Sequence, residues 1–504
     1  MITPPESAPP LEAALATNPA LTSLTPKPEV LAPEELTQTT GTGELLRLPE
    51  VQKAITGDFV ILPCDLVSEL EGSKLVQQWM TLNPLSISAK AEKAKGGMGL
   101  FYPTQGLEGI SHKKDETDFI ATVALPKAPV AAPQGSLRQD VEELVLSMPT
   151  DTLKDLLEED KESSLKIRQS LIAKHSRVKI KTKHRDSHVY IFPKWVKELA
   201  AQNDKFDSIS EDVLGWWAKA GWQDGLGDKL GLDEVLGERD AQSPGEDGMA
   251  ENEQEIDVST LSSTTTSRPP ISTSTDTPSF ASRVKSSPLP SKSATNPPPL
   301  LAYIQPSLPS TVNAPTASHP FVRRVDTTAA LLNTSLYLAK QTPEHALAHE
   351  HKIHPTASVG QQSRISQEDS LVGENAKLGM RVNIKETIVG PNCEIGSNSR
   401  LTRCLLMDSV VVGEGVQLTG CIIGRRAKIE GMKPAPSEEK KAEGKKKGGD
   451  EDERTRLTEC EVAPGFVVES GTQSKGEKLM GFDTEEGMDD FGDDDGDEGE
   501  GLEL

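Results

Sequence analysis

The chain has 504 residues, a formal net charge of −24 and an aromatic content of 4%. It is too long for a single domain, and its 40 Gly and 36 Pro with few aromatic residues indicate that much of it is not packed core. The acidic balance disfavours wrapping of nucleic acid, and half of it falls in the last 24 residues, which hold 12 Asp or Glu and no Lys or Arg.

The sequence contains no apolar run of 18 residues, and its N-terminus lacks the layout of a signal peptide. Its five cysteines are an odd number without a CxxC pair, which favours a reducing compartment. We therefore expect a cytosolic protein with no membrane contact. Cys404 and Cys421 lie 17 residues apart. A metal site there is the alternative, but with no His nearby we interpret both as buried apolar residues.

Residues 1–240 indicate an incomplete α/β domain. A short helix fits residues 44–53, although Pro49 interrupts it. The apolar run 59–62 is typical of a strand buried in a parallel sheet, and a helix is expected over 72–80. Asp65 follows the strand end, which is where ligands bind in open α/β sheets.

Later in the same region, residues 189–192 form a second apolar segment ahead of an amphipathic stretch at 195–201. Trp216, Trp217 and Trp222 follow, and we interpret them as packing residues.

Residues 241–300 are predicted to be a disordered linker, because 28 of the 42 residues from 259 to 300 are Ser, Thr or Pro. Such a composition cannot bury enough apolar surface to offset the ordering of its backbone. Residues 301–350 regain apolar content and are expected to connect the domains, with a helix over 331–339.

An apolar residue recurs about every sixth position from 372 to 429, which gives a period of 17 and predicts a β-helix of stacked hexapeptide rungs over 351–480. Glycine follows the same period, and we expect Gly or a small polar residue to turn each corner, where φ is often positive. The predicted inward residues are Val372, Leu378, Ile384, Val389, Ile395, Leu401, Leu406, Val412, Leu418, Ile423 and Ile429.

The β-helix is predicted to be interrupted once, by a charged insertion at 431–456. Leu457, Val462 and Val468 continue the same register after it, so the extra residues belong at one corner, where insertions are tolerated. A solvated loop is the simpler interpretation, and a contact arm for a partner or for RNA is the alternative, although the mixed charge disfavours strong phosphate binding. Ser399 is expected to point outward, two residues before the inward Leu401. Residues 481–504 are expected to be a disordered acidic tail.

Five segments together resemble the sugar-nucleotide pyrophosphorylases and, within that group, the gamma-subunit family of translation initiation factor 2B. The resemblance covers about two-thirds of the chain, and a strand ending in Leu-Pro-Cys-Asp-Leu followed by this β-helix is its specific part. The segments are Thr40-Gly41-Thr42-Gly43-Glu44-Leu45-Leu46-Arg47, Asp58-Phe59-Val60-Ile61-Leu62-Pro63-Cys64-Asp65-Leu66-Val67, Asp186-Ser187-His188-Val189-Tyr190-Ile191-Phe192, Leu405-Leu406-Met407-Asp408-Ser409-Val410 and Gly420-Cys421-Ile422-Ile423-Gly424.

The resemblance implies an incomplete Rossmann-like nucleotidyltransferase domain and a left-handed β-helix. It also implies a non-catalytic subunit that supports an epsilon subunit in GDP/GTP exchange on initiation factor 2. The expected partners are the epsilon subunit, the other subunits of the complex and initiation factor 2, with no direct contact to nucleic acid. No cofactor is expected.

This sequence departs from the pyrophosphorylases in one respect that bears on catalysis. Nothing before Gly41 resembles their Gly-rich, Lys-containing phosphate loop, so we expect the chain to lack the first segment of that domain. Asp65 matches a metal-binding carboxylate of those enzymes, and residues 41–43 match a base-contacting loop. We interpret both as relics and assign no catalytic, cofactor-binding or metal-binding residue.

Two alternatives stay open. The first is a truncated sugar-nucleotide pyrophosphorylase similar to mannose-1-phosphate guanylyltransferase, which an upstream Gly-rich loop would support. The second is a hexapeptide acyltransferase, which uses a His between β-helices. His351 and His354 lie at the β-helix entry and no His follows, so this alternative is disfavoured.

Overall fold

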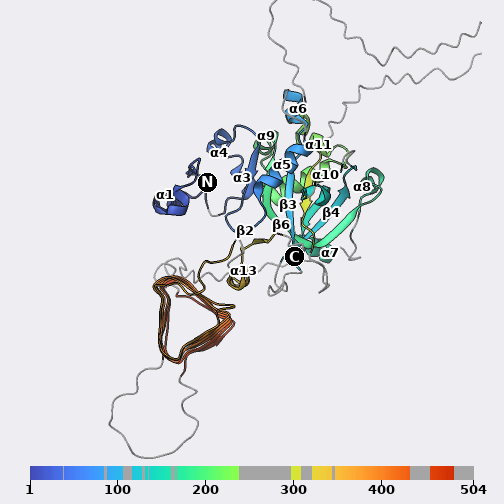
Figure 1. The fold of residues 1–504 in the computed structure, drawn as a ribbon. Coiled ribbons are helices and arrows are strands. Elements are labelled where there is room, and N and C mark those ends of the chain that lie inside the picture. The colour runs from blue at the N-terminus through green and yellow to red at the C-terminus, as the bar shows by residue number, and fades with distance from the viewer. Residues whose placement is uncertain are drawn as a thin grey trace, which may run out of the picture.

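A mixed sheet with flanking helices and a β-helix of triangular cross-section make up the fold (Figure 1). The computed structural model describes residues 1–37, 39–83, 88–105, 116–127, 131–133, 135–159, 165, 167–237, 297–307, 320–342, 347–431 and 454–481. Most of the expected linker (241–300), most of the charged insertion (431–456) and all but the first residue of the acidic tail (481–504) lie outside these residues.

The central sheet of the α/β domain has the strand order β1-β6-β3-β7-β5-β4. Among its described pairs, only β3–β7 is parallel. Two further strands, β2 and β8, form a separate antiparallel pair. The strands are β1 (Phe59–Ile61), β2 (Leu66–Ser68), β3 (Met98–Pro103), β4 (Asp118–Ala124), β5 (Val141–Pro149), β6 (Lys179–Phe192), β7 (Leu301–Ile304) and β8 (Val322–Arg324).

Most helices are short and connect or cover the strands. They are η1 (Pro5–Ser7), α1 (Ala8–Thr17), α2 (Pro19–Thr22), α3 (Thr42–Leu45), α4 (Pro49–Ala54), α5 (Gly72–Leu82), α6 (Ala89–Lys93), η2 (Leu137–Asp140), α7 (Thr150–Glu159), α8 (Gln169–Lys174), α9 (Trp195–Gln202), η3 (Ile209–Leu214), α10 (Gly215–Ala220), α11 (Leu226–Lys229), α12 (Leu232–Leu236) and α13 (Thr328–Lys340). Within the described residues, no helix is long and apolar enough to cross a membrane.

The α/β domain has two main apolar cores. The larger joins α9, η3, α10 and α12 to β6 and includes the fully buried Trp217 and Phe192. The second packs α5 against β3 and β7. Trp222 is buried in a smaller cluster, whereas Trp216 is 38% exposed, so two of the three expected packing tryptophans are buried.

Several expected elements are confirmed with small shifts. Helix α5 covers the predicted 72–80, α9 covers 195–201, and α13 contains 331–339. The predicted helix 44–53 is split into α3 and α4, because Pro49 begins a new helix at a position where its missing N–H costs nothing.

Two expectations for this domain are wrong. The apolar run at 59–62 is not a buried parallel strand, because β1 pairs antiparallel with β6 at the edge of the sheet, where Val60 is 45% exposed. A continuous apolar run does not distinguish the two cases. Part of the segment 301–350 is not a connection, since β7 lies inside the sheet between β3 and β5.

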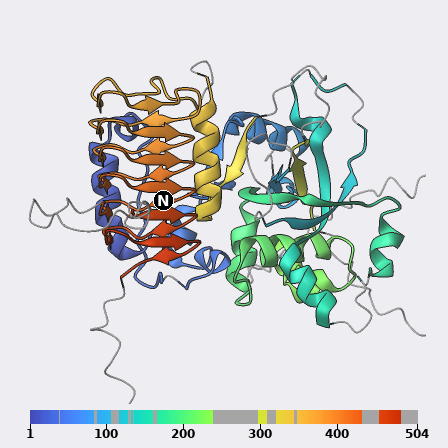
Figure 2. The same ribbon diagram turned by 90° about the horizontal axis from the view of Figure 1, so that it is seen from below.

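The C-terminal β-helix is left-handed and builds its three faces from three six-stranded parallel sheets (Figure 2). One face holds β10 (Arg364–Ile365), β13 (Asn383–Lys385), β16 (Arg400–Thr402), β19 (Gln417–Thr419), β22 (Arg456–Thr458) and β25 (Gln473–Lys475). The second holds β11 (Leu371–Val372), β14 (Ile388–Val389), β17 (Leu405–Leu406), β20 (Ile422–Ile423), β23 (Glu461–Val462) and β26 (Lys478–Leu479). The third holds β9 (Ser358–Val359), β12 (Lys377–Leu378), β15 (Glu394–Ile395), β18 (Val411–Val412), β21 (Lys428–Ile429) and β24 (Val467–Val468).

The predicted register is confirmed at every described coil. Leu378, Ile395 and Val412 pair directly, one period apart, and all are buried. Leu457 stacks on Leu418, so the register resumes after the insertion as expected.

Small polar residues take positive φ at corners of the β-helix, as expected, but the periodic glycines do not. At Gly396, φ is ordinary, but a Cβ would lie 2.5 Å from the backbone carbon of Gly413 in the next coil. Positive φ falls instead on other corner residues, such as Asn392 and Asn398. Coil-to-coil contact, and not backbone handedness, therefore requires these glycines.

Ser399 does not point outward as expected. It is 1% exposed, and its Oγ donates to the carbonyl of Gly413 at 2.9 Å. Corner positions of the β-helix turn inward as well as the rung positions, so the inside also holds Cys393, Cys404, Cys421 and Cys460. The thiols of Cys404 and Cys421 donate to backbone carbonyls, in agreement with buried apolar cysteines.

Helix α13 joins the two parts of the fold and lies along one face of the β-helix (Figure 2). Leu332 and Leu336 pack against the outward side chains of Leu405 and Ile422. On its other side, Tyr337 stacks on Phe321, with ring centroids 4.7 Å apart, next to β8. The same helix thus fixes the β-helix to the α/β domain.

Candidate functional site: a carboxylate and arginine cluster

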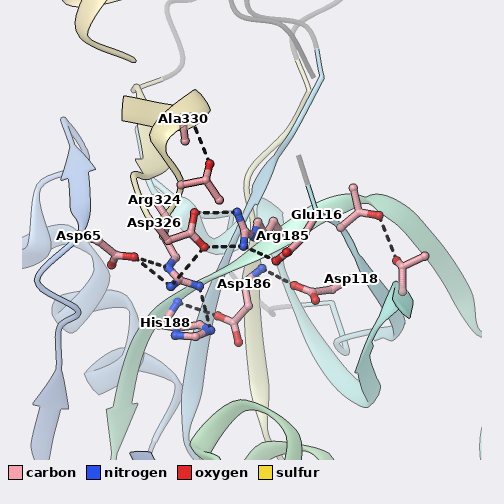
Figure 3. A network of polar contacts seen from close by, with 12 residues as sticks. Asp65, Glu116, Asp118, Arg185, Asp186, His188, Arg324, Asp326 and Ala330 are labelled. Carbon is pink, nitrogen blue, oxygen red and sulfur yellow. Dashed lines mark hydrogen bonds and ion pairs between the residues drawn. The ribbon is translucent and has the colours of Figure 1, made fainter. Parts of the chain in front are cut away.

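A β-bulge in β6 creates the site. The pairing of β3 with β6 shifts between Gly99 and Phe101, and His188 on the bulged side has a φ of 56°. Ser187 repairs part of the lost ladder, because its Oγ donates to the carbonyl of Leu100 at 2.8 Å. Bulges re-aim side chains next to sites, and this one brings Asp186 and His188 together (Figure 3).

Arg324 lies between two carboxylates at the centre of the cluster (Figure 3). Its Nε and Nη2 donate to Oδ2 of Asp65 at 3.1 and 2.9 Å. Nη2 also lies 3.6 Å from Oδ2 of Asp326. The side chains of Arg324 and Asp65 are only 14% and 18% exposed, so solvent screens this pair weakly.

Arg185 is the second guanidinium that binds Asp326. Its Nη1 and Nη2 donate to the two carboxylate oxygens at 3.2 and 2.6 Å, a bidentate arrangement. Nη2 also donates to Glu116 at 2.7 Å. Both guanidinium groups of the cluster are therefore bound by carboxylates of this chain.

Two further carboxyl groups lie behind the arginines. The backbone N–H of Asp186 donates to Oδ2 of Asp118 at 2.5 Å, and the hydroxyl of Tyr190 donates to Asp186 at 2.6 Å. Burial raises the pKa of Asp118 to about 6. Burial, and then the charge of Asp118, raises the pKa of Asp186 to about 7.

His188 completes the cluster as a neutral base. Its Nε2 lies 3.1 Å from Nη1 of Arg324. A guanidinium can only donate, so this nitrogen accepts and the imidazole is uncharged. Burial and the positive charge of Arg324 lower the pKa of His188 to about 4, in agreement with that geometry.

A cavity of about 380 Å³ opens beside these side chains. Besides the cluster, hydroxyl groups line it, and one oxygen of Asp65, Oδ1, is buried without a hydrogen-bond partner. The lining residues are Thr42, Glu116, Thr117, Asp118, Ser147, Met148, Pro149, Thr150, Asp151, Arg185, Asp186, His188, Ser208, Ser210, Glu211, Arg324 and Asp326.

Two regions that the sequence had singled out lie at the cluster and at its cavity. Asp65 follows β1 and faces the cluster, and Thr42 lies on the cavity wall. Thr42 accepts the N–H of Ile209 at 3.1 Å, and Gly43 donates to the carbonyl of Asp207 at 2.7 Å. In this structure both regions serve to hold the chain together, and their interpretation as relics stays a prediction.

Sequence reasoning missed most of the cluster. Arg324 ends β8 and Asp326 follows it, far along the chain from Asp65. The sequence Arg323-Arg324-Val325-Asp326 just before a helix was the available signal. Asp118 and Arg185 gave none.

Within the described residues, no group of three or more His, Cys, Asp or Glu side chains is arranged to hold a metal ion. In the cluster the counter-charges of the carboxylates are arginines. The described geometry therefore supports a closed network of ion pairs.

Comparison with known proteins concerns the β-helix. Residues 354–436 match the family model described as GlmU-like, C-terminal hexapeptide. The β-helix is similar to GlmU-like hexapeptide domains. The match begins at the entry of the β-helix and leaves the α/β domain and α13 without a counterpart. No curated protein matches the chain.

Proposed function

We propose that the chain is a non-catalytic subunit of the translation initiation factor 2B complex, in which it supports an epsilon subunit during GDP/GTP exchange on initiation factor 2. The observation that carries the proposal is the position of Arg324 between Asp65 and Asp326. Nucleotide chemistry that uses a carboxylate pair to bind a cation would first have to remove this guanidinium from a weakly screened site.

The rest of the architecture supports a holding role. A β-helix offers a long rigid surface that needs little reorganisation on binding. Helix α13 packs on the β-helix through Leu332 and Leu336, and on the α/β domain through Tyr337, which stacks on Phe321. The proposed partners are the epsilon subunit, the other subunits of the complex and initiation factor 2, in the cytosol and without direct contact to nucleic acid or membrane.

The test is affinity purification of the tagged full chain from cytosol, followed by a GDP-release assay on initiation factor 2. We expect exchange-factor subunits to co-purify, no release by this chain alone, and faster release once an epsilon subunit is added. Asp65→Asn is the matched variant and should support release as well as the unchanged chain. Recovery of the chain without any exchange-factor subunit contradicts the proposal.

A sugar-nucleotide pyrophosphorylase is the second candidate. It is favoured by the convergence of Asp65 and Asp326 on Arg324, beside the cavity, and by the GlmU-like match of the β-helix. Its test is pyrophosphate release from a nucleoside triphosphate with a sugar phosphate and Mg²⁺. Release that is lost in Asp65→Asn establishes this candidate, and no release by the unchanged chain eliminates it.

A further inference from the structure

One face of the β-helix is basic although the protein is acidic. On the sheet of β10, β13, β16, β19, β22 and β25, the first outward row alternates arginine with an amide residue. From coil to coil it reads Arg364, Asn383, Arg400, Gln417, Arg456 and Gln473. The second row reads Lys385, Thr402, Thr419, Thr458 and Lys475. We call these two rows the basic face.

The basic face holds five cations and no carboxylate, and all five cationic residues are exposed. None of them forms an ion pair with another residue in the described part of the chain. Acidic residues of these coils lie outside the basic face, at corners such as Glu386, Glu414 and Glu459 and on the other two faces, at Glu394 and Glu461. The neighbouring face differs, because there Lys377 pairs with Glu394 at 2.7 Å.

A hollow marks one end of the basic face. It has a volume of about 560 Å³ and carries two guanidinium groups, those of Arg364 and Arg381. Arg381 is oriented by its Nε, which donates to Gln362 at 3.0 Å. The lining is completed by Ser363, Val382 and Asn383. An acidic side chain would find donors there on more than one side.

We propose that the acidic C-terminal tail of this chain, residues 482–504, lies along the basic face. The tail follows Gly481 directly after β26, in the same coil as Lys475. Its extended length of up to about 75 Å exceeds the height of six stacked coils, about 24 Å. The tail can therefore run from the last coil to the hollow at Arg364.

The charge spacings of the two partners agree. Arginines in the first row recur every second coil, about 9.6 Å apart. In the tail, acidic residues recur at every third position, which is about 10 Å in an extended chain. The two series are Asp483, Glu486 and Asp489, followed by Asp494, Asp497, Glu500 and Glu503. An external acidic partner would therefore have to displace the tail from the basic face. This inference does not depend on whether the chain belongs to the exchange complex.

Zero-length carbodiimide cross-linking of the full chain tests the proposal. The reporters are Lys385 on the basic face and Lys377 on the neighbouring face, which lie in consecutive strands and are both exposed. We expect tail carboxylates to cross-link to Lys385 at low salt, far above Lys377, and the yield to fall in 1 M salt, where the Debye length is about 3 Å.

A triple variant, Arg364→Gln, Arg400→Gln and Arg456→Gln, removes the arginines but keeps the reporter. We expect it to lower the Lys385 yield about tenfold, as loss of three exposed ion pairs implies. The charge-matched control replaces Arg138, Arg425 and Arg426 by Gln, and should leave the yield unchanged. Fluorescence of the buried tryptophans and protection of the buried thiols check that each variant is folded.

Four outcomes overturn the proposal. They are equal yields at Lys385 and Lys377, an unchanged yield in the arginine variant, and cross-links that form only between differently isotope-labelled chains, which would make a second copy the source of the tail. The fourth is tight binding of a single-stranded RNA that displaces the tail and depends on the same arginines, which would make the face a nucleic-acid surface.

Discussion

Arg324 shows how one side chain can decide what a cluster of carboxylates does. Asp65 and Asp326 come from distant parts of the chain and converge on the guanidinium of Arg324. With the guanidinium of Arg324 between them, the charges of the two carboxylates stabilise the fold. Nε2 of His188, on the bulge of β6, accepts a hydrogen bond from the same guanidinium. A weakly screened ion network of this kind is costly to break from one side only.

Arg324→Gln is therefore expected to lower the free energy of unfolding by about 3 kcal/mol, because it leaves weakly exposed carboxylates without their counter-charge. Adding Asp65→Asn should restore about half of that loss, since the unpaired charge is then removed. Urea unfolding followed by tryptophan fluorescence measures both values, because all five tryptophans lie in the α/β domain. Additive effects of the two substitutions in the double variant would contradict a direct pairing of Arg324 with Asp65.

Asp118 gives a pH prediction. Burial raises its pKa to about 6, so between about pH 4 and pH 6 the folded state binds more protons than the unfolded state. The free energy of unfolding therefore falls as the pH rises through this window. We expect Asp118→Asn to be more stable than the unchanged chain by about 1–2 kcal/mol at pH 7.5, with little difference at pH 4.

Urea unfolding of the unchanged chain and of Asp118→Asn at each pH measures this difference in the free energy of unfolding. The contribution of His188 is present in both chains and largely cancels in the difference. Asp151→Asn is the control, because Asp151 is well exposed, at 68%, and its loss should change stability equally at both pH values. A pH-independent difference for Asp118→Asn would show that its carboxyl is not the titrating group.

At the scale of elements, the β-helix was predictable because one physical pattern repeats. Each rung contributes one inward side chain, so the register of Leu401 could be read from the spacing alone. The corners were less predictable, because the inward residues there, such as Ser399 and Cys404, are small or polar and do not mark a core position by themselves. The role of glycine at Gly396 could not be read either, since contact between coils is not visible in a linear pattern.

Leu401→Asp is expected to cost at least about 4 kcal/mol, because it buries an unpaired carboxylate in the apolar column. The control is Asn398→Asp, which adds the same charge at an exposed corner with a φ of 60° that Asp tolerates. Thiol reactivity in urea is the measurement, because the four buried cysteines all lie in the β-helix. Equal effects of the two changes would show that the register is wrong.

At the scale of the whole molecule, the sequence predicted the division into an α/β part and a β-helix but not the path of the chain between them. Strand β7 enters the sheet only after the Ser, Thr and Pro-rich segment, and it pairs parallel with β3. Its four residues have no periodicity long enough to assign. The carboxylate cluster was hidden for the same reason, because tertiary pairing places Asp326 beside Arg185.

Because strand β7 brings the chain back into the sheet after the linker, we predict that the linker can be shortened. Lys93 donates to the carbonyl of Gly237 at 2.8 Å, just before the linker, and Gly96 packs against the backbone of Pro299, at the end of the linker. The two ends of the linker therefore lie near each other. Deleting residues 259–295 should change the free energy of unfolding by about 1 kcal/mol or less, because closure entropy varies slowly with loop length.

The deletion has to end before Pro298, whose carbonyl accepts the indole N–H of Trp217 at 2.8 Å. Leu301→Asp is the contrasting variant, since Leu301 is 3% exposed in β7, and it should lower the melting temperature sharply. Thermal unfolding followed by tryptophan fluorescence compares the two variants. A large loss of stability in the deletion alone would mean that residues 259–295 pack against the α/β domain.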